Sequence, residues 1–321
     1  MKSALIAGVN GQDGSYLAKI LLQNNYKVIG LIRGGTNNLK NLNYLEITNK
    51  IILLECDLMD ISQVISIIQK YKPNEIYNLA AQSSVNKSFS QPIGTFHFNT
   101  ISVFNLLESI KLIDKSIKFY QASSSEMYGR VNKLPIDEKS VIHPLSPYAI
   151  SKVAAHYTCI NYREIYGLFI CCGILFNHES YLRNDNFFVK KVIRDSIAIV
   201  NGEKSFLEVG NIDIKRDFGF APKYVEAMYL MMQQDIPEDY IVCSGESVSL
   251  REIIYYVFDK LNLKHELCVV KKEFYRPTDI EDIYGTNEKA KKDLNWNYDL
   301  TFFDVLDILI KEELENYNLQ A

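Results

Sequence analysis

The chain has 321 residues, of which 47% are hydrophobic, and its formal net charge at neutral pH is −4. This length suits one large domain or two, and the apolar content suffices for a sizeable core. The weak negative charge, without any run rich in Lys and Arg, argues against nucleic-acid binding as the main function. No stretch reads as a signal peptide or a membrane span, so we expect a cytoplasmic protein that acts away from membranes.

The cysteines point to the same compartment. The sequence has six of them, with no C-x-x-C pair and no Cys or His spacing typical of a metal site. Such residues are typical of free thiols in a reducing environment, and we expect no structural zinc and no other metal.

The first informative motif follows a short apolar run at residues 3–7, which is typical of a buried parallel strand. It places Gly8, Gly11, Gln12, Asp13 and Gly14 directly before a helical pattern. Strand, glycine-rich turn and helix occur in the order that a dinucleotide site requires, because glycine permits a tight turn and the helix N-terminus offers free N–H groups to a diphosphate. An ordinary turn between a strand and a helix would show the same pattern.

A second expected strand, at residues 26–32, ends at Arg33 with Gly34, Gly35 and Thr36 behind it. Sites that prefer NAD carry an Asp or Glu near this point, which binds the ribose 2′-hydroxyl. No acid stands here, and a guanidinium among small neighbours suits a 2′-phosphate. The sequence therefore favours NADP over NAD, unless Arg33 is a solvated side chain at the end of a strand.

Strands and helices continue to alternate through the first half of the chain, which predicts a doubly wound parallel α/β fold. Ligands bind such sheets at the carboxyl ends of the strands. Asp57 follows the expected strand at residues 50–54, and its carboxylate could accept a hydrogen bond from an adenine amino group. The expected strand at residues 75–83 ends in small residues, which would let the backbone approach a cofactor. The expected strands are residues 50–54, 75–83, 117–122 and 169–175, and the expected helices are residues 61–71 and 96–113.

The stretch from residue 121 to residue 152 holds the residues best suited to catalysis. Pro147 at a first helical position puts Tyr148 and Lys152 one turn apart on the same face of a helix. A free tyrosine has a pKa of about 10, and a neighbouring ammonium and a cationic nicotinamide would both favour the phenolate that a base requires. Tyr256 and Lys260 have the same spacing, but they fall in an amphipathic helix far from any nucleotide motif, and we interpret them as surface and core residues.

The second half of the chain has a less regular pattern. Helices are expected at residues 187–200, 222–233 and 250–261, with a polar loop at residues 181–186. This pattern predicts a smaller α+β lobe that covers the carboxyl ends of the strands. We divide the chain into a cofactor domain at residues 1–176, to which residues 211–235 return, and a substrate domain at residues 177–321.

These motifs resemble the extended short-chain dehydrogenase/reductases, which have a Rossmann fold, and more narrowly the GDP-mannose 4,6-dehydratases. The similarity covers nearly the whole chain. It is carried by residues 11–18 (GQDGSYLA), 75–83 (EIYNLAAQS), 119–123 (FYQAS), 173–180 (GILFNHES), 215–219 (KRDFG), 224–228 (YVEAM) and 276–278 (RPT).

The resemblance implies a redox-neutral elimination from a GDP-hexose. Tyr148 would take the proton of the sugar 4-hydroxyl while hydride leaves C4 for NADP⁺, and Lys152 would hold the phenolate and the nicotinamide ribose. Glu126 would then remove the C5 proton and protonate the departing 6-hydroxyl, before hydride returns to C6. Ser124, where the family usually has Thr, would hydrogen-bond the 4-oxygen, and Ser125 follows the family. If these residues have no catalytic role, Glu126 is a helix-capping carboxylate and the serines at residues 123–125 form an ordinary turn.

The resemblance also implies the binding residues and a homodimer or homotetramer. Arg216 and Arg276 suit a diphosphate because the planar guanidinium matches its oxygens. The implied substrate-binding residues are Ser83, Asn177, Glu179, Lys191, Arg216, Arg276 and Asp279. The implied cofactor-binding residues are Gly8, Gly11, Gln12, Asp13, Gly14, Arg33, Asp57, Leu58, Leu79, Ala80, Ala81, Ser83, Tyr148, Lys152, His178 and Arg183.

The chain departs from the family pattern near the expected sugar and ribose sites. Leu145 replaces a common arginine, Ser84 replaces a larger residue, Ala7 stands for Thr, and Gly34 stands where a second arginine is frequent. Residues 181–186 depart from the usual Pro-x-Arg-Gly loop. The sugar could therefore be mannose, a manno-heptose or an N-acetylated hexose such as N-acetylglucosamine.

Two further functions are compatible with the same motifs. A GDP-sugar 4-epimerase, 4-dehydrogenase or 4-reductase would use the Tyr148 and Lys152 pair but needs no carboxylate at Glu126. A non-catalytic NADP-sensing protein would need none of these three side chains. The presence of all three therefore favours the dehydratase.

Overall fold

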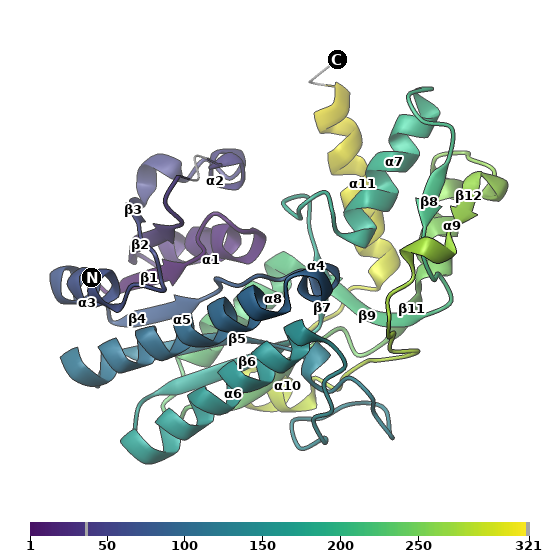
Figure 1. Cartoon of the computed structure of the whole chain (residues 1–321). Coiled ribbons are helices and arrows are strands. Elements are labelled where there is room, and N and C mark those ends of the chain that lie inside the picture. The colour runs from purple at the N-terminus through teal and green to yellow at the C-terminus, as the bar shows by residue number, and fades with distance from the viewer. Residues whose placement is uncertain (36–37, 319–321) are drawn as a thin grey trace.

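A computed structural model describes residues 1–35 and 38–318 and contains a seven-stranded, all-parallel sheet (Figure 1). The strand order β10-β6-β5-β4-β1-β2-β3 confirms the predicted doubly wound fold, because the chain moves outward from β1 in both directions. The strands are β1 (Ser3–Ala7), β2 (Lys27–Ile32), β3 (Ile52–Glu55), β4 (Glu75–Asn78), β5 (Lys118–Ser124), β6 (Ile170–Leu175) and β10 (Asp239–Val242).

Helices cover both faces of this sheet. On one face α1 (Gln12–Gln23) packs on α8 (Ala221–Met232), with α10 (Glu288–Leu294) beside it. On the other face lie α3 (Ile61–Tyr71), α5 (Pro92–Ile113) and α6 (Pro147–Tyr166). Fully burying one aliphatic side chain contributes about 1.5–3 kcal/mol, so these two apolar layers hold the sheet in place. Among residues 1–35 and 38–318, no helix is long and apolar enough to cross a membrane.

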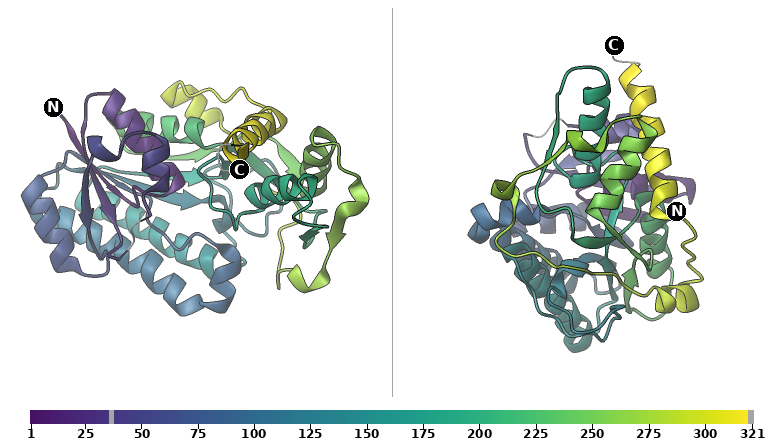
Figure 2. Two further views of the ribbon diagram at one scale, coloured as in Figure 1. Left: turned by 90° about the horizontal axis from the view of Figure 1, so that it is seen from above. Right: turned by 90° about the vertical axis from the view of Figure 1, so that its right-hand side faces the viewer.

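A smaller lobe lies beyond the carboxyl ends of the strands (Figures 1 and 2). Its core is formed by apolar residues of α7 (Phe188–Val200), α9 (Leu250–Lys260) and α11 (Phe302–Asn318). A three-stranded sheet with the strand order β11-β9-β7 joins this lobe to the part of the chain that holds the seven-stranded sheet. A two-stranded sheet pairs β12 with β8. These strands are β7 (Asn177–Glu179), β8 (Leu207–Val209), β9 (Lys215–Phe220), β11 (Ser247–Ser249) and β12 (Cys268–Val270).

The short elements complete the chain. They are α2 (Lys40–Tyr44), α4 (Val85–Ser90) and the 3-10 turns η1 (Thr48–Lys50), η2 (Ser125–Met127), η3 (His265–Leu267) and η4 (Lys272–Phe274).

Two predicted boundaries were wrong around β4. The expected strand at residues 75–83 ends at Asn78, and the expected helix at residues 96–113 already begins at Pro92. The Leu79 N–H still donates to the Ala7 carbonyl of β1 at 3.0 Å, but further along the chain backbone groups bond to side chains and no longer to a neighbouring strand. The Gln82 N–H donates to Asn99 at 2.8 Å, and Ser84 caps α4 by accepting from the Lys87 N–H at 3.2 Å. This cap is the structural role of Ser84.

Candidate active site

The glycine turn has the shape that a dinucleotide diphosphate requires. Gly8 has φ +81°, which L side chains rarely adopt, and a Cβ added to Gly14 would lie 2.3 Å from the Gly8 carbonyl oxygen. The N-cap of α1 is Gly11, whose missing side chain leaves the first helical N–H groups without a side-chain cap. A carboxylate or phosphate at this end would meet free donors and the positive end of the helix dipole.

The other residues expected around the cofactor lie at the same edge of the sheet. A Cβ on Gly8 would approach the Ala80 Cα to 3.1 Å, so the segment behind β4 packs directly on the glycine turn. Leu79, Ala81 and Ser83 belong to that segment, and Asp57 and Leu58 follow β3. The small residues there allow this close packing, and the approach to a cofactor that the sequence predicts for them stays a prediction.

Arg33 lies exposed at the end of β2, at the edge that holds the glycine turn. Asn10 of the turn donates to the Asn38 carbonyl at 3.2 Å, which holds the segment behind Arg33 against the turn. Thr36, which the sequence places beside Arg33, lies outside the described residues. The location therefore fits a ribose 2′-substituent, and the role of Arg33 stays a prediction.

Helix α6 carries Tyr148 and Lys152 as expected. Ser146 is its N-cap and accepts from the Ala149 N–H at 3.1 Å, Pro147 stands in the first turn, and Gly167 ends the helix with φ +67°. Tyr148 and Lys152 are both buried on the face that packs against β5. The capped start of α6 therefore fixes the position of the phenol.

Tyr148 meets the end of β5. Its hydroxyl lies near Ser124 and Glu126, the second residue of η2, which Ser125 opens. Burial raises the pKa of Tyr148 to about 12, and the nearby Ser124 hydroxyl only partly opposes this. We expected an adjacent ammonium to lower this pKa. In the structure the desolvation of the phenolate by burial is the larger effect.

The Lys152 ammonium is directed at the backbone of β5. Its Nζ donates to the Ala122 carbonyl at 2.9 Å and lies 5.8 Å from the centroid of the Tyr148 ring. Burial lowers the pKa of Lys152 to about 8. The ammonium is thus poised between the strand and the phenol, with donors to spare for a further ligand.

Glu126 shares a small pocket with the two arginines expected to bind a diphosphate. Asp279 lies between these arginines, 3.7 Å from Arg216 and 3.8 Å from Arg276. The pocket is lined by Val85, Glu126, Leu145, Ser146, Arg216, Arg276, Thr278, Asp279 and Ile280. Positive charge and the candidate C5 base thus meet in one place, although Glu126 and Arg216 are far apart in the sequence.

The remaining residues expected to bind substrate are spread along the smaller lobe. Asn177 donates to the Asp217 carbonyl at 3.2 Å, and Lys191 donates to the Glu208 carbonyl at 2.6 Å, beside the ring of Phe274. Glu179 is buried, and burial raises its pKa. Asn177, Glu179 and Lys191 do not line the pocket of Glu126.

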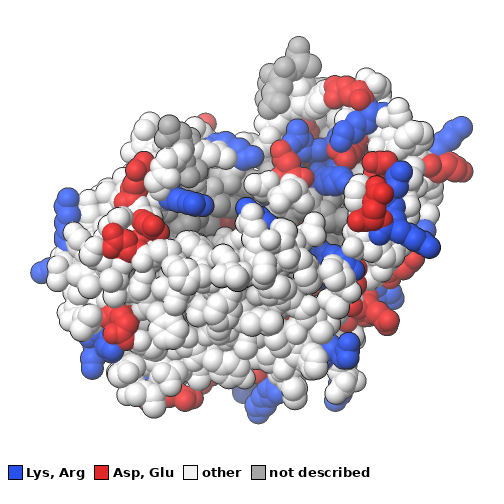
Figure 3. All heavy atoms as spheres, in the orientation of Figure 1, with Lys and Arg blue, Asp and Glu red and all other residues white. Residues whose placement is uncertain are grey.

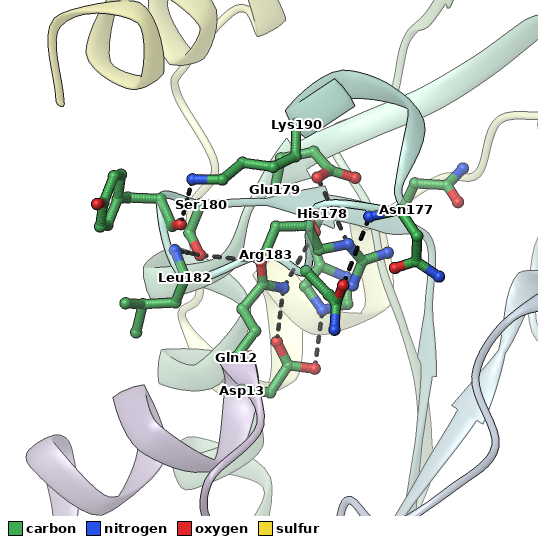
Figure 4. Close-up of polar contacts among 12 residues, drawn as sticks. Gln12, Asp13, Asn177, His178, Glu179, Ser180, Leu182, Arg183 and Lys190 are labelled. Atoms are coloured by element: carbon green, nitrogen blue, oxygen red, sulfur yellow. Dashed lines mark hydrogen bonds and ion pairs between the residues drawn. The ribbon is translucent and has the colours of Figure 1, made fainter. Parts of the chain in front are cut away.

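His178 and Arg183 close over the glycine turn (Figure 4). His178 Nε2 lies 2.9 Å from Asp13 Oδ2, and the Arg183 Nε lies 3.5 Å from Glu179. Burial alone would raise the pKa of Asp13, but His178, Gln12 and Arg183 together outweigh it and the pKa falls to about 2. The contact between His178 and Asp13 joins α1 to β7 across 165 residues of sequence.

Several site residues were missed in the sequence. Asn99 is buried and donates both to the Gln82 carbonyl and to Ser151 of α6. His156 Nδ1 lies 3.0 Å from the Ser123 hydroxyl, which gives α6 a second contact with β5 next to that of Lys152. From sequence alone, an Asn or His within a helix that holds a neighbouring element of the site cannot be told apart from one that is simply a polar residue of the core. The position of His156 two turns after Tyr148, on the same helix face, was the available signal.

The second Tyr-x-x-x-Lys pair lies on the smaller lobe, as interpreted. Tyr256 and Lys260 both donate to Asp307 of α11 at 2.9 Å, far from the glycine turn. In the part of the chain that the structure describes, no group of three or more His, Cys, Asp or Glu side chains could hold a metal ion.

Comparison with known proteins decides the family. A sequence profile described as GDP-mannose 4,6 dehydratase matches residues 5–309. The chain belongs to the GDP-mannose 4,6-dehydratase family. It is 42% identical to GDP-mannose 4,6 dehydratase 1 of Arabidopsis thaliana over 326 residues, covering 98% of this chain and 90% of that protein. It is 37% identical to the GDP-mannose 4,6-dehydratase of Vibrio cholerae, covering 98% of this chain and 94% of that protein.

Solved structures agree with this family in fold. A dTDP-glucose 4,6-dehydratase from Bacillus anthracis in complex with NAD has a TM-score of 0.87 at 19% identity, covering 99% of this chain and 98% of that chain. RMD from Pseudomonas aeruginosa complexed with NADPH has a TM-score of 0.81 at 23% identity, covering 97% of this chain and 98% of that chain. At these identities the structural similarity establishes the fold alone. The chemistry follows from the residues of the site.

Proposed function

We propose that this protein is a GDP-sugar 4,6-dehydratase that uses NADP and converts a GDP-hexose of the mannose type to the GDP-4-keto-6-deoxy sugar. The observation that carries the proposal is the meeting of Tyr148, Ser124 and Glu126 at the end of β5, with Glu126 in the pocket of Arg216 and Arg276. A reductase or epimerase needs the tyrosine, but it has no step that uses the carboxylate.

The first half of the reaction uses Tyr148, Lys152 and Ser124. The proton of the sugar 4-hydroxyl passes to the Tyr148 oxygen, while Ser124 donates to the sugar oxygen and Lys152 stabilises the phenolate. A nicotinamide cofactor held at this edge of the sheet would supply the hydride chemistry between C4 and C6. Gly8, Gly14 and the uncapped start of α1 would hold its diphosphate.

The second half uses Glu126. A ketone at C4 acidifies the C5–H bond, so the carboxylate can remove that proton and then give it to the departing 6-hydroxyl, which leaves as water. Arg216 and Arg276 would hold the diphosphate of the substrate and so keep C5 in reach of Glu126. No net oxidation occurs, because C4 loses the hydride that C6 gains. C5 regains a proton when the hydride adds to C6, and this proton balances the one that Tyr148 took from the 4-hydroxyl.

A panel of GDP-sugars tests this proposal directly. We expect the purified protein with NADP to remove one water from a GDP-hexose or GDP-heptose of the manno series, measured by mass spectrometry of the nucleotide sugar. A product of unchanged mass would indicate an epimerase, and an absence of reaction with every GDP-sugar would contradict the proposal. GDP-mannose, GDP-manno-heptose and GDP-N-acetylglucosamine distinguish the candidate substrates.

The choice of NADP rests on Arg33. Arg33→Ala is expected to lower the preference for NADP over NAD by about tenfold to a hundredfold, because a charge-assisted contact to a 2′-phosphate contributes about 1.5–3 kcal/mol. Equilibrium titration of both cofactors by fluorescence measures this preference, and rising salt should weaken NADP binding more than NAD binding. Lys27→Ala, at the other end of β2, is the matched control. If the Arg33 variant keeps full NADP selectivity, Arg33 does not bind the 2′-phosphate and is only a solvated side chain.

We also propose a homo-oligomer built on α5 and α6, either a homodimer or a homotetramer. These helices pack on each other, and their outer face exposes large apolar side chains, including Ile93 (83% exposed), Ile165 (66%) and Tyr157 (54%). Figure 3 shows a broad surface with few charges over α5 and α6. A surface with few charges and several exposed large apolar side chains is typical of interfaces between subunits.

Tyr157→Glu is expected to dissociate this oligomer, because a charge buried without a partner costs several kcal/mol. Light scattering after gel filtration measures the mass of the particle and separates a dimer from a tetramer. Ile236→Glu is the matched control, since Ile236 is 69% exposed but follows α8 in the chain and is not part of α5 or α6. A monomeric wild type, or a Tyr157 variant of unchanged mass, would contradict the proposed interface.

We propose a cofactor domain at residues 1–176 and 211–235 and a substrate domain at the rest of residues 177–321, with Arg216 of the cofactor domain reaching the pocket of Glu126. We also propose a location in the cytoplasm. All six cysteines are free and five of them are buried, which is typical of a reducing compartment.

A further inference from the structure

Residues 178–183, which we call the strap, run from β7 across the glycine turn (Figure 4). Gln12 of α1 holds the strap twice, because its Nε2 donates to the His178 carbonyl at 3.2 Å and its Oε1 accepts from Ser180 at 2.9 Å. Asp13 adds the contact with His178. The strap therefore lies over the helix end where a dinucleotide diphosphate binds.

The far end of the strap is held by α2, which belongs to the cofactor domain. Asn41 is buried, and its Nδ2 donates both to the Asn10 carbonyl of the glycine turn at 3.1 Å and to the Leu182 carbonyl of the strap at 3.4 Å. Beside it the rings of Tyr44 and Tyr181 pack with their centroids 4.7 Å apart. The Asn41 side chain and the ring pair of Tyr44 and Tyr181 thus join the strap to α2.

A second layer holds Tyr181 from the side of the smaller lobe. Lys190 of α7 donates to the Tyr181 carbonyl at 2.7 Å, lies 4.0 Å from the centroid of its ring, and pairs with Glu313 of α11. Since the strap is held from both lobes at once, it can leave the glycine turn only if its contacts with Asn41 and Tyr44 break together with those to Gln12 and Asp13.

We propose that Asn41, Tyr44 and Tyr181 are positioning residues that lock the strap over the bound nicotinamide dinucleotide and keep it in the protein through many turnovers. This inference rests on the proposed function, in which each turnover returns the hydride and regenerates the cofactor. Release of the dinucleotide is then no step of the cycle, and a closed strap retains the cofactor without slowing the reaction. A dehydrogenase that must exchange its cofactor in every turnover would be slowed by the same contacts.

The rate of cofactor release tests the lock. The protein is loaded with NADPH, mixed with excess NADP⁺, and the loss of bound NADPH is followed by its fluorescence. Tyr181→Ala and Asn41→Ala are expected to release NADPH at least about tenfold faster than wild type, the factor that corresponds to about 1.4 kcal/mol. Tyr181→Phe keeps the ring and should match the wild type. Tyr255→Ala removes a comparable ring stacked on His265 in the smaller lobe and should also leave the rate unchanged.

A second measurement needs no variant. Amide hydrogen exchange of residues 178–183 in the wild type is expected to slow when NADPH binds, because the strap must open less often. Release at the wild-type rate from both Ala variants, or exchange in the strap that NADPH does not change, would overturn the lock. Failure of the proposed function is seen in a different measurement, since the wild type would then remove water from none of the GDP-sugars, whatever the rate at which it releases NADPH.

Discussion

Tyr148→Phe is expected to abolish oxidation at C4 and, with it, the loss of water. A positioned base contributes about 10²–10⁴-fold, and the phenylalanine ring fills the same space without a proton acceptor. The measurement is the absorbance of reduced cofactor in a single turnover with the GDP-sugar, together with mass spectrometry of the product. Cofactor binding should be unchanged, because only the hydroxyl is removed.

Tyr256→Phe is the matched control for this variant. Tyr256 and Lys260 repeat the spacing of Tyr148 and Lys152 on α9, where the Tyr256 hydroxyl contacts Asp307 of the smaller lobe, so full activity is expected. Retention of turnover within about tenfold of wild type in Tyr148→Phe would transfer the base role to another group.

The same group predicts the dependence on pH. Burial raises the pKa of Tyr148 to about 12, so the phenol holds its proton at neutral pH. A base acts only after losing its proton, and the rate of C4 oxidation should therefore rise with pH up to the pKa of the phenol in the ternary complex. Tyr148→Phe should lack this rise.

Glu126→Gln is expected to stop the elimination but not the oxidation. The amide is nearly isosteric with the carboxylate, yet it cannot take the C5 proton or protonate the leaving hydroxyl. Hydride transfer from C4 precedes both steps, so reduced cofactor should accumulate on the enzyme while the GDP-sugar loses only the hydrogens of the C4 oxidation. Absorbance of the bound cofactor and mass spectrometry measure the two halves of the reaction separately.

Glu164→Gln, an exposed carboxylate on the same helix as Tyr148, is the matched control and should behave as the wild type. If Glu126→Gln binds GDP-sugar yet forms no reduced cofactor, Glu126 acts before or during oxidation and the assigned order is wrong. If Glu126→Gln still releases water at the wild-type rate, another acid performs the elimination.

The sequence alone predicted the elements whose signals are local. The glycine turn and α1 follow from Gly8 to Gly14, because the backbone shape of a tight turn depends on residues close together in the chain. The start of α6 follows from Ser146, whose hydroxyl caps the helix, and from Pro147, whose fixed φ suits its first turn. Tyr148 and Lys152 are therefore already placed on one helix face before any tertiary contact forms.

The sequence could not predict where strands end when distant side chains decide it. β4 stops at Asn78 because Asn99 of α5 takes up the backbone of Gln82. β10 was missed because its four residues carry little pattern, and it is a strand only because β6 offers it a partner. Short strands of the smaller lobe, such as β8, were missed for the same reason.

The composition of the site was likewise decided by the tertiary structure. The carboxyl ends of β4 and β5 bring Ala80 and Ser124 to one edge, but only packing of the smaller lobe brings Arg216 and Arg276 to Glu126. The pKa of Tyr148 depends on how much water the surrounding chain excludes, and sequence spacing carries no information on that. Local sequence thus determined which groups are available on each element. Long-range packing decided which of them meet and how strongly each holds its proton, because desolvation and charge contact depend on distances in space.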